Sequence, residues 1–417
     1  MINGKKFLIT IISISIVSWL RFVLTPFLIV YSGNYEGFIY LQTSSESIRL
    51  AIVLMCYEIL VTNILLYVFI SLQKENINIS IPVIRGSKKI YFLFLILTTL
   101  VLLFIGLPNN ILQFFILEVD GTERVGDIEG TNMVLTQQIL ITGLILAFAW
   151  SVEILRNKYN IKKRVLYVNI AILIAAFNVS VIVGERRSYL VYSAIASIVL
   201  LTRAFPTYKK KIVISISSVA IVVIGLMSVY KFFYAFYYDS YLEAFSNSQI
   251  DLGSWAATLQ AYFLGPENVA LAIDMSENNS LNLSNVFYDI GRSIFGLSFI
   301  FKNFGATTVE IFNTHNYGYS RTNGQILSTI GYGYTYFGFL IAPIFVAFNI
   351  WISIKLEYLL KKTDSLIMIY LWSYLLMRFT VGIYTNPAPL ISLSTIMLGT
   401  VGLLYITSIL IRKIKVK

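Results

Sequence analysis

The stretch GERRSYLVYSAIASIVLLTRAFPTYKKK, residues 184–211, decides how the chain folds. An arginine pair stands before its apolar run and three lysines follow it. About 20 apolar residues are enough to cross a bilayer as an α-helix. Because Lys and Arg gather in cytoplasmic loops, we expect the lysine end to face the cytoplasm and the arginine pair to face the opposite side.

The same pattern recurs along the chain and predicts an all-α, polytopic membrane protein. Of the 417 residues, 57% are hydrophobic and only 13% are charged. A soluble domain cannot bury so much apolar surface. About ten transmembrane helices of sufficient length are predicted. They cover residues 7–30, 49–71, 90–107, 134–155, 165–183, 188–204, 211–230, 326–354, 364–384 and 389–411.

The charge distribution sets the predicted orientation. The loops expected on the inner side, residues 74–89, 156–164, 203–211 and 355–362, are all basic, as is the tail 412–417. An even number of spans places both termini in the cytoplasm. The net charge of +11 is spread over these loops rather than gathered in one patch. This distribution therefore indicates contact with membrane lipids and argues against a nucleic-acid-binding protein.

One large extracytoplasmic loop, residues 231–325, is predicted within a single integral membrane domain, residues 1–417. Two parts of this loop, residues 252–272 and 286–304, are apolar but interrupted by Gly and charged residues. We expect them to form interfacial or re-entrant helices. The start of the loop is dense in Tyr and Phe, which settle at the level of the lipid headgroups.

The first candidate site is the turn that contains Glu185, Arg186 and Arg187. Adjacent arginines at a helix end point in different directions, so they can bind different oxygens of one diphosphate. Each guanidinium offers a two-pronged donor that keeps its charge. The alternative is that the pair reaches lipid phosphates or binds Glu185. We favour a catalytic pair, because topology disfavours arginine in a short outer turn.

Three further arginines are expected on the same side of the membrane. Arg292 and Arg321 lie in the large loop, and Arg378 lies near the outer end of a predicted span. All three are candidates for binding an anionic substrate. The alternatives are solvated loop charges for the first two and a structural salt bridge for Arg378, whose apolar surroundings make an unpaired charge costly.

His315 is the only histidine, and Cys56 is the only cysteine. Imidazole is suited to moving a proton near neutral pH, so His315 is a candidate catalytic base, with Glu185 as the alternative. An ordinary polar role for a lone loop histidine is equally open. One histidine cannot form a site with several histidine ligands. We predict no metal and no cofactor.

Two charged residues fall within predicted spans near the N-terminus. Glu58 would be a proton-relay residue in a transporter, or else it is neutral or hydrogen-bonded to a neighbour such as Asn63 or Thr62. Arg21 is expected to anchor a helix end. Neither residue belongs to the predicted catalytic set.

The sequence GERRSY, residues 184–189, and the late large loop resemble the Wzy-type polymerases of bacterial surface polysaccharides. The segment GQILSTIGYGYTYFG, residues 324–338, is similar to the helix entry that follows the large loop in that family. The pair His315–Asn316 resembles a His-Asn pair of the related O-antigen ligases, although Ile326 stands where those ligases have a glycine. The likeness in topology covers nearly the whole chain.

The resemblance implies an enzyme of the bacterial cytoplasmic membrane. It would polymerise oligosaccharide repeat units carried on undecaprenyl diphosphate, by inverting, metal-independent glycosyl transfer at the outer face. A chain-length regulator is an implied partner. Two alternatives remain open at this point: an O-antigen-type ligase, and a non-enzymatic flippase or exporter of lipid-linked oligosaccharide. The concentration of polar residues in one outer loop favours the enzyme over the transporter, whose charged residues gather near the membrane midplane.

Overall fold

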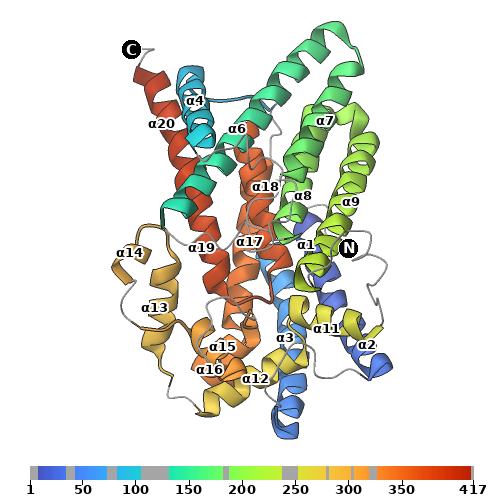
Figure 1. Ribbon diagram of the computed structural model, residues 1–417, viewed down its shortest axis with the longest axis vertical. Helices are drawn as coiled ribbons and strands as arrows, with labels where there is room; N and C mark the ends of the chain where they lie inside the picture. Colours follow the sequence, from blue (N-terminus) through green and yellow to red (C-terminus); the bar gives the residue numbers. More distant parts are fainter. Residues whose placement is uncertain are drawn as a thin grey trace. The chain divides into compact units, whose positions relative to one another are not determined.

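The computed structural model describes residues 8–33, 43–72, 82–104, 131–181, 187–236, 252–278, 281–301, 305–318 and 326–414. In these residues all of the named elements are helices, as predicted (Figure 1). Five helical segments are long and apolar enough to cross a membrane: Leu8–Ser32, Ser45–Leu72, Gln138–Lys162, Pro206–Met227 and Pro387–Arg412. These segments support a multi-pass membrane protein.

The described part of each predicted span is mostly helical, but several of these helices are too short to count among the candidate membrane spans. The first span contains α1 (Leu8–Trp19), a π-helical turn (Leu20–Leu24) and α2 (Thr25–Ser32). Further helices of the chain are α3 (Ser45–Leu72), α4 (Lys88–Phe104), α6 (Thr131–Lys162), α7 (Leu166–Ser180), α8 (Arg187–Ala204), α9 (Lys209–Phe236), α18 (Leu366–Val381), α19 (Pro387–Met397) and α20 (Leu403–Ile414).

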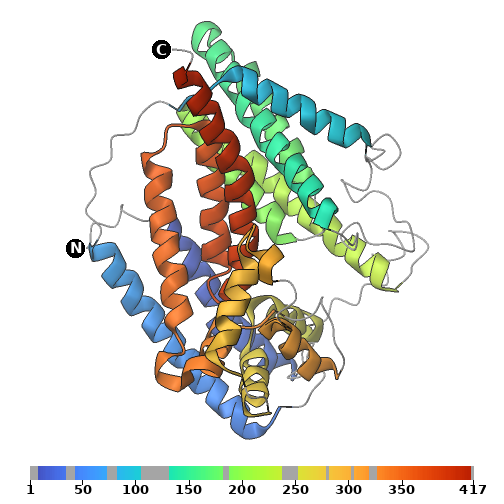
Figure 2. The same cartoon turned by 90° about the vertical axis from the view of Figure 1, so that its left-hand side faces the viewer.

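The span predicted for residues 326–354 is not one straight helix. α16 (Thr329–Ile341) and α17 (Ile344–Lys362) meet at 108°, and the sharp turn between them is visible in Figure 2. Gly338 has a φ of 67°, a conformation that glycine adopts without a steric penalty. A Cβ on Gly333 would lie 1.9 Å from the carbonyl oxygen of Ala342, so only glycine permits the chain to fold back this closely. Counted as one broken span, this pair raises the number of candidates to six.

The chain forms two compact units. The first contains Met1–Asn76, Ile250–Tyr358 and Leu376–Ile396, and the second contains Ile77–Gln249, Leu359–Leu375 and Met397–Lys417. In the second unit, α6 packs against α4 and α7, and α8 packs against α9. Buried polar contacts reinforce this packing: the hydroxyl group of Tyr370 hydrogen-bonds to Asn178 and Ser193.

The first unit contains the described parts of the large loop from residue 252 onward, whereas residues 231–236 continue α9 and belong to the second unit. The parts in the first unit form α11 (Leu252–Phe263), α12 (Pro266–Asn278), α13 (Leu283–Ser293), α14 (Ser298–Phe301) and α15 (Thr308–Tyr317). α12 packs against α3, α15 and α16, and α11 packs against α2. Residues 268–273 of α12 are all buried. This enclosure differs from the one-sided burial of an interfacial helix, because residues of this part of α12 contribute to two separate apolar clusters.

Candidate functional site

α13 carries the first part of the candidate site. Asn282 caps the helix by accepting a hydrogen bond from the backbone N–H of Ser284, and the side chain of Asn285 accepts one from the backbone N–H of Asn282. Capping of this kind satisfies backbone donors that would otherwise lack partners. Asp289 is buried on one face of the helix, whereas Arg292, one turn later, remains partly exposed.

α15 supplies the second part, and its start is fixed by a capping box. The hydroxyl oxygen of Thr307 accepts a hydrogen bond from the backbone N–H of Glu310 at 3.3 Å. In return, the carboxylate of Glu310 accepts one from the backbone N–H of Thr307 at 2.7 Å. This Thr-x-x-Glu pattern is a sequence signature of a helix start. It holds the Glu310 carboxylate in one place at the beginning of the helix.

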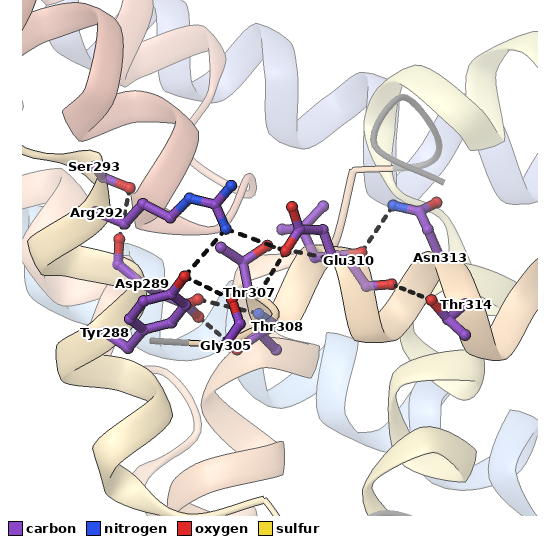
Figure 3. A network of polar contacts seen from close by, with 11 residues as sticks. Tyr288, Asp289, Arg292, Ser293, Gly305, Thr307, Thr308, Glu310, Asn313 and Thr314 are labelled. Atoms are coloured by element: carbon purple, nitrogen blue, oxygen red, sulfur yellow. Dashed lines mark hydrogen bonds and ion pairs between the residues drawn. The ribbon is translucent and has the colours of Figure 1, made fainter. Parts of the chain in front are cut away.

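Arg292 connects the two helices (Figure 3). Its Nη1 atom donates to Glu310 Oε2 and to the hydroxyl oxygen of Tyr288, each at 3.2 Å. The hydroxyl group of Tyr288 in turn donates to the carbonyl of Gly305 at 2.6 Å. Partial burial opposes the charge of Arg292, but Glu310 and Tyr288 raise its pKa above the ordinary value. The guanidinium is therefore a permanent, positioned cation.

The remaining nitrogens of Arg292 have no hydrogen-bond partner among the residues that the structure describes. In Figure 3 the second terminal nitrogen points away from Glu310 and Tyr288. The side chain is 34% exposed, against 22% for Glu310. One nitrogen of the two-pronged donor is thus used for positioning, and the other is available to an anion.

Asp289 fastens α13 to the start of α15 from the buried side. Its carboxylate accepts hydrogen bonds from the backbone N–H of Thr308 at 3.0 Å, from the hydroxyl group of Thr308, and from the hydroxyl group of Tyr332 at 2.9 Å. Burial raises the pKa of Asp289, and the hydrogen bonds from Thr308 and Tyr332 oppose this rise. A carboxylate at a helix N-terminus also interacts favourably with the helix dipole. Asp289 consequently fixes the helix that carries Arg292.

His315 lies on α15 and faces a different neighbour. It is half-buried, and its buried Nε2 atom has no hydrogen-bond partner among the described residues. Burial lowers the pKa of His315, while the neighbouring Asp274 opposes that shift. Asp274 itself accepts a hydrogen bond from the hydroxyl group of Ser47 on α3. The imidazole is therefore held mainly neutral at pH 7, the form that accepts a proton.

The structure does not join His315 and Arg292 in one hydrogen-bonded network within the described residues. Glu310, the partner of Arg292, and His315 are five positions apart on α15. This separation corresponds to about 7.5 Å along a helix axis. His315 lies on α15 and Arg292 lies on the neighbouring α13, and each of them faces a different set of side chains.

Arg378 has a structural role in the geometry described. It is buried near the end of α18 and donates to the backbone carbonyls of Pro389 and Leu390 in α19. No carboxylate partner for it appears in the part of the chain that the structure describes. In place of the salt bridge that was the alternative expectation, Arg378 donates hydrogen bonds to backbone oxygens. These bonds also compensate a buried charge.

Arg21, expected to anchor a helix end, is instead completely buried beside Glu58. That expectation is wrong because the partner lies on α3 and cannot be seen from the local sequence. Glu185, Arg186 and Arg321 lie outside the described residues. Arg187 begins α8, as expected of a helix-end arginine, but its side chain lies outside the description as well.

The sequence patterns did not point to Asp289, Glu310 or Tyr288, the tyrosine that supports Arg292. The pattern Thr307-x-x-Glu310 was a usable signal for the start of α15. Asp289 gave no such signal, since its partners Thr308 and Tyr332 are distant in the sequence or on another helix. Within the described ranges no group of three His, Cys, Asp or Glu side chains could hold a metal ion.

Comparisons of the chain with protein-family models, with characterised proteins and with solved structures find no match.

Proposed function

We propose that the protein polymerises oligosaccharide repeat units carried on undecaprenyl diphosphate. The observation that carries this proposal is the positioned, half-engaged guanidinium of Arg292 in the helices of the large loop. A diphosphate has the charge and the oxygen geometry that such a donor binds best. The resemblance of residues 184–189 to Wzy-type polymerases supplies the substrate class.

The reaction is a single displacement that inverts the anomeric carbon. A hydroxyl oxygen of the acceptor sugar attacks the anomeric carbon of the donor glycan, and the bond from that carbon to the lipid diphosphate breaks. The bonding pair leaves with the diphosphate, whose negative charge grows in the transition state. Arginine side chains stabilise this charge without a metal: Arg186 and Arg187 are the pair that the resemblance implies, and Arg292 and Arg321 are the candidates in the large loop. The proton of the acceptor hydroxyl passes to His315 or to Glu185.

The lowered pKa of His315 supports its part in this scheme. A general base must be unprotonated at the working pH, and burial keeps His315 in that form. Arg378 is buried and engaged with backbone carbonyls, so we assign it to support of the site rather than to direct contact with the diphosphate.

The proposal includes the orientation of the chain. About ten spans, with both termini in the cytoplasm, place residues 231–325 outside the bacterial cytoplasmic membrane. The short helices α4, α7, α8 and α18 count as spans in this arrangement. Lipid-linked glycans and membrane lipids are the partners, with a chain-length regulator as a further one.

The proposal is tested with the full chain, purified in detergent and supplied with a lipid-linked repeat unit. Glycan ladders are expected without added metal or nucleotide. Arg186→Ala and Arg187→Ala should abolish them, because the leaving diphosphate loses its counter-charge. The control is Arg49→Ala: Arg49 is exposed on α3, where it makes no ion pair with a described residue, and ladders should persist.

Two other results would replace the proposal. Transfer of the glycan to a different acceptor, with no ladder, would indicate a ligase. Movement of labelled lipid across vesicles with no transfer would indicate a flippase. Ladders formed equally well by Arg186→Ala and Arg187→Ala would remove this arginine pair from the mechanism.

A further inference from the structure

A fully buried ion pair lies within the first two candidate spans, away from the helices of the large loop. Nη2 of Arg21 is 2.9 Å from Oε2 of Glu58, and both side chains are 0% exposed. Arg21 stands in the π-helical turn of the first span, and Glu58 stands at the middle of α3. Both residues are thus close to the midpoints of their candidate spans.

The pair is far from saturated with hydrogen bonds. All three side-chain nitrogens of Arg21 and both carboxylate oxygens of Glu58 lack a hydrogen-bond partner among the described residues. A guanidinium carries five N–H donors, and a carboxylate can accept about four hydrogen bonds. The pair therefore presents many buried donor and acceptor positions that one close contact does not satisfy.

Aromatic contacts meet only part of this need. The ring of Tyr384 lies 4.6 Å from the Arg21 guanidinium carbon, and that of Phe22 lies 5.4 Å away. Cation–π contacts of this kind contribute to holding the charge, but a ring offers no hydrogen bond to a carboxylate. Removing two ions from water is costly unless their remaining donors and acceptors are satisfied.

A second group of polar atoms without described partners lies beside residues 383–386, the turn that contains Tyr384. Asn349 donates to the carbonyl of Ile383 at 2.9 Å, while its Oδ1 atom has no partner in the described part of the chain. Asn386 caps the start of α19 by accepting from Ala388, and its Nδ2 atom likewise has no described partner. Both residues are 0% exposed, and both flank the segment that carries Tyr384.

We propose that this centre, formed by Arg21, Glu58 and the Tyr384 turn, is a water-binding site inside the candidate membrane-spanning region. Water is the ligand that fits, because it donates and accepts, and because the pair has no net charge to recruit a free ion. Buried waters typically make about three hydrogen bonds to polar groups that lack other partners. The first unit thus has a wet, charged centre at the middle of its first two candidate spans. This inference does not depend on the proposed function.

Radiolytic footprinting of the full chain in detergent tests this site with water as its own probe. Hydroxyl radicals formed from bound water oxidise adjacent side chains even when these are buried. Tyr384 is only 3% exposed, and Phe312, which lies in an apolar cluster, is 0% exposed. Relative to the unfolded chain, Tyr384 should be oxidised several-fold faster than Phe312. Equal protection of the two residues would show a dry centre and overturn the inference.

A paired variant identifies what holds the water. Arg21→Met combined with Glu58→Met removes the polar groups while keeping similar volume, so oxidation of Tyr384 should fall to the level of Phe312. The matched control, Arg292→Met combined with Glu310→Met, should leave oxidation of Tyr384 unchanged. Persistent oxidation of Tyr384 in a folded Arg21→Met/Glu58→Met protein would overturn the assignment. If that protein does not fold, the comparison of Tyr384 with Phe312 in the unmodified chain decides the question.

Discussion

Two arginine–glutamate pairs in the same compact unit have opposite surroundings. Arg21 and Glu58 are completely buried, whereas Arg292 and Glu310 are 34% and 22% exposed. In this partly exposed pair, Arg292 donates a hydrogen bond to the hydroxyl oxygen of Tyr288, and Glu310 accepts one from the backbone N–H of Thr307. The buried pair has none from the described residues.

The comparison shows that proximity of opposite charges does not define a role. In the partly exposed pair, one nitrogen of Arg292 holds the guanidinium in place on the loop helices, and the other nitrogens of Arg292 remain available to a ligand. The buried pair is inaccessible to a large substrate and instead links the first two candidate spans. We therefore expect the exposed pair to affect activity and the buried pair to affect stability.

The largest expected effect comes from breaking the buried pair. Glu58→Ala leaves an uncompensated buried guanidinium, so the free energy of unfolding should fall by about 3–5 kcal/mol. Unfolding in detergent, followed by tryptophan fluorescence, measures this change. Arg21→Met/Glu58→Met should recover most of the loss. A single substitution that costs less than about 1 kcal/mol would contradict the strong coupling inferred here.

A smaller loss is expected at Asp289. Asp289→Ala leaves the donors of Thr308 and Tyr332 without their acceptor, which should cost about 2–3 kcal/mol in the same measurement. Asp289→Asn keeps an acceptor for the Thr308 backbone and should cost about 1 kcal/mol. Equal losses for the two variants would mean that the hydrogen bonds from Thr308 to Asp289 do not hold the helices together.

The exposed pair should contribute little to stability. Arg292→Ala should change the free energy of unfolding by less than about 1 kcal/mol, because solvent screens a pair of this exposure. The same variant should lose ladder formation if Arg292 binds the diphosphate. A loss of several kcal/mol on Arg292→Ala would instead assign this arginine to the fold.

The smallest expected effect is a pH dependence from His315. Its pKa is lowered from the ordinary value of 6.5, so the folded state binds fewer protons than the unfolded state at acidic pH. Stability should therefore be complete above 6.5 and fall as the pH drops below it. The slope of unfolding free energy against pH measures this, and His315→Gln should reduce the slope. An unchanged slope in His315→Gln would show that other groups cause it.

The positions of the helices could be predicted well from the sequence. Long apolar runs such as residues 49–71 coincide with helices such as α3, because burial of an apolar run in a bilayer requires internally satisfied backbone groups. The bend between α16 and α17 could not be predicted in this way. It depends on Gly333 meeting the backbone of Ala342, and hydropathy is insensitive to such contacts.

The candidate site was less predictable than the fold. Charge topology singled out Arg292, but its partner Glu310 lies on another helix, and its supporting residue Asp289 is fixed by tertiary contacts. The same limit applies to Arg21, whose partner Glu58 is one helix away. A sequence pattern identifies residues that need a partner, while only the fold determines which partner they have.

The substitution Arg292→Lys tests the central claim most directly. Lysine keeps a positive charge beside Glu310 but removes the second terminal nitrogen that the diphosphate would bind. With purified protein and a lipid-linked repeat unit, we predict loss of the glycan ladder while the unfolding midpoint stays unchanged. Ladders of normal length and rate from Arg292→Lys would contradict a role for the guanidinium in binding the diphosphate.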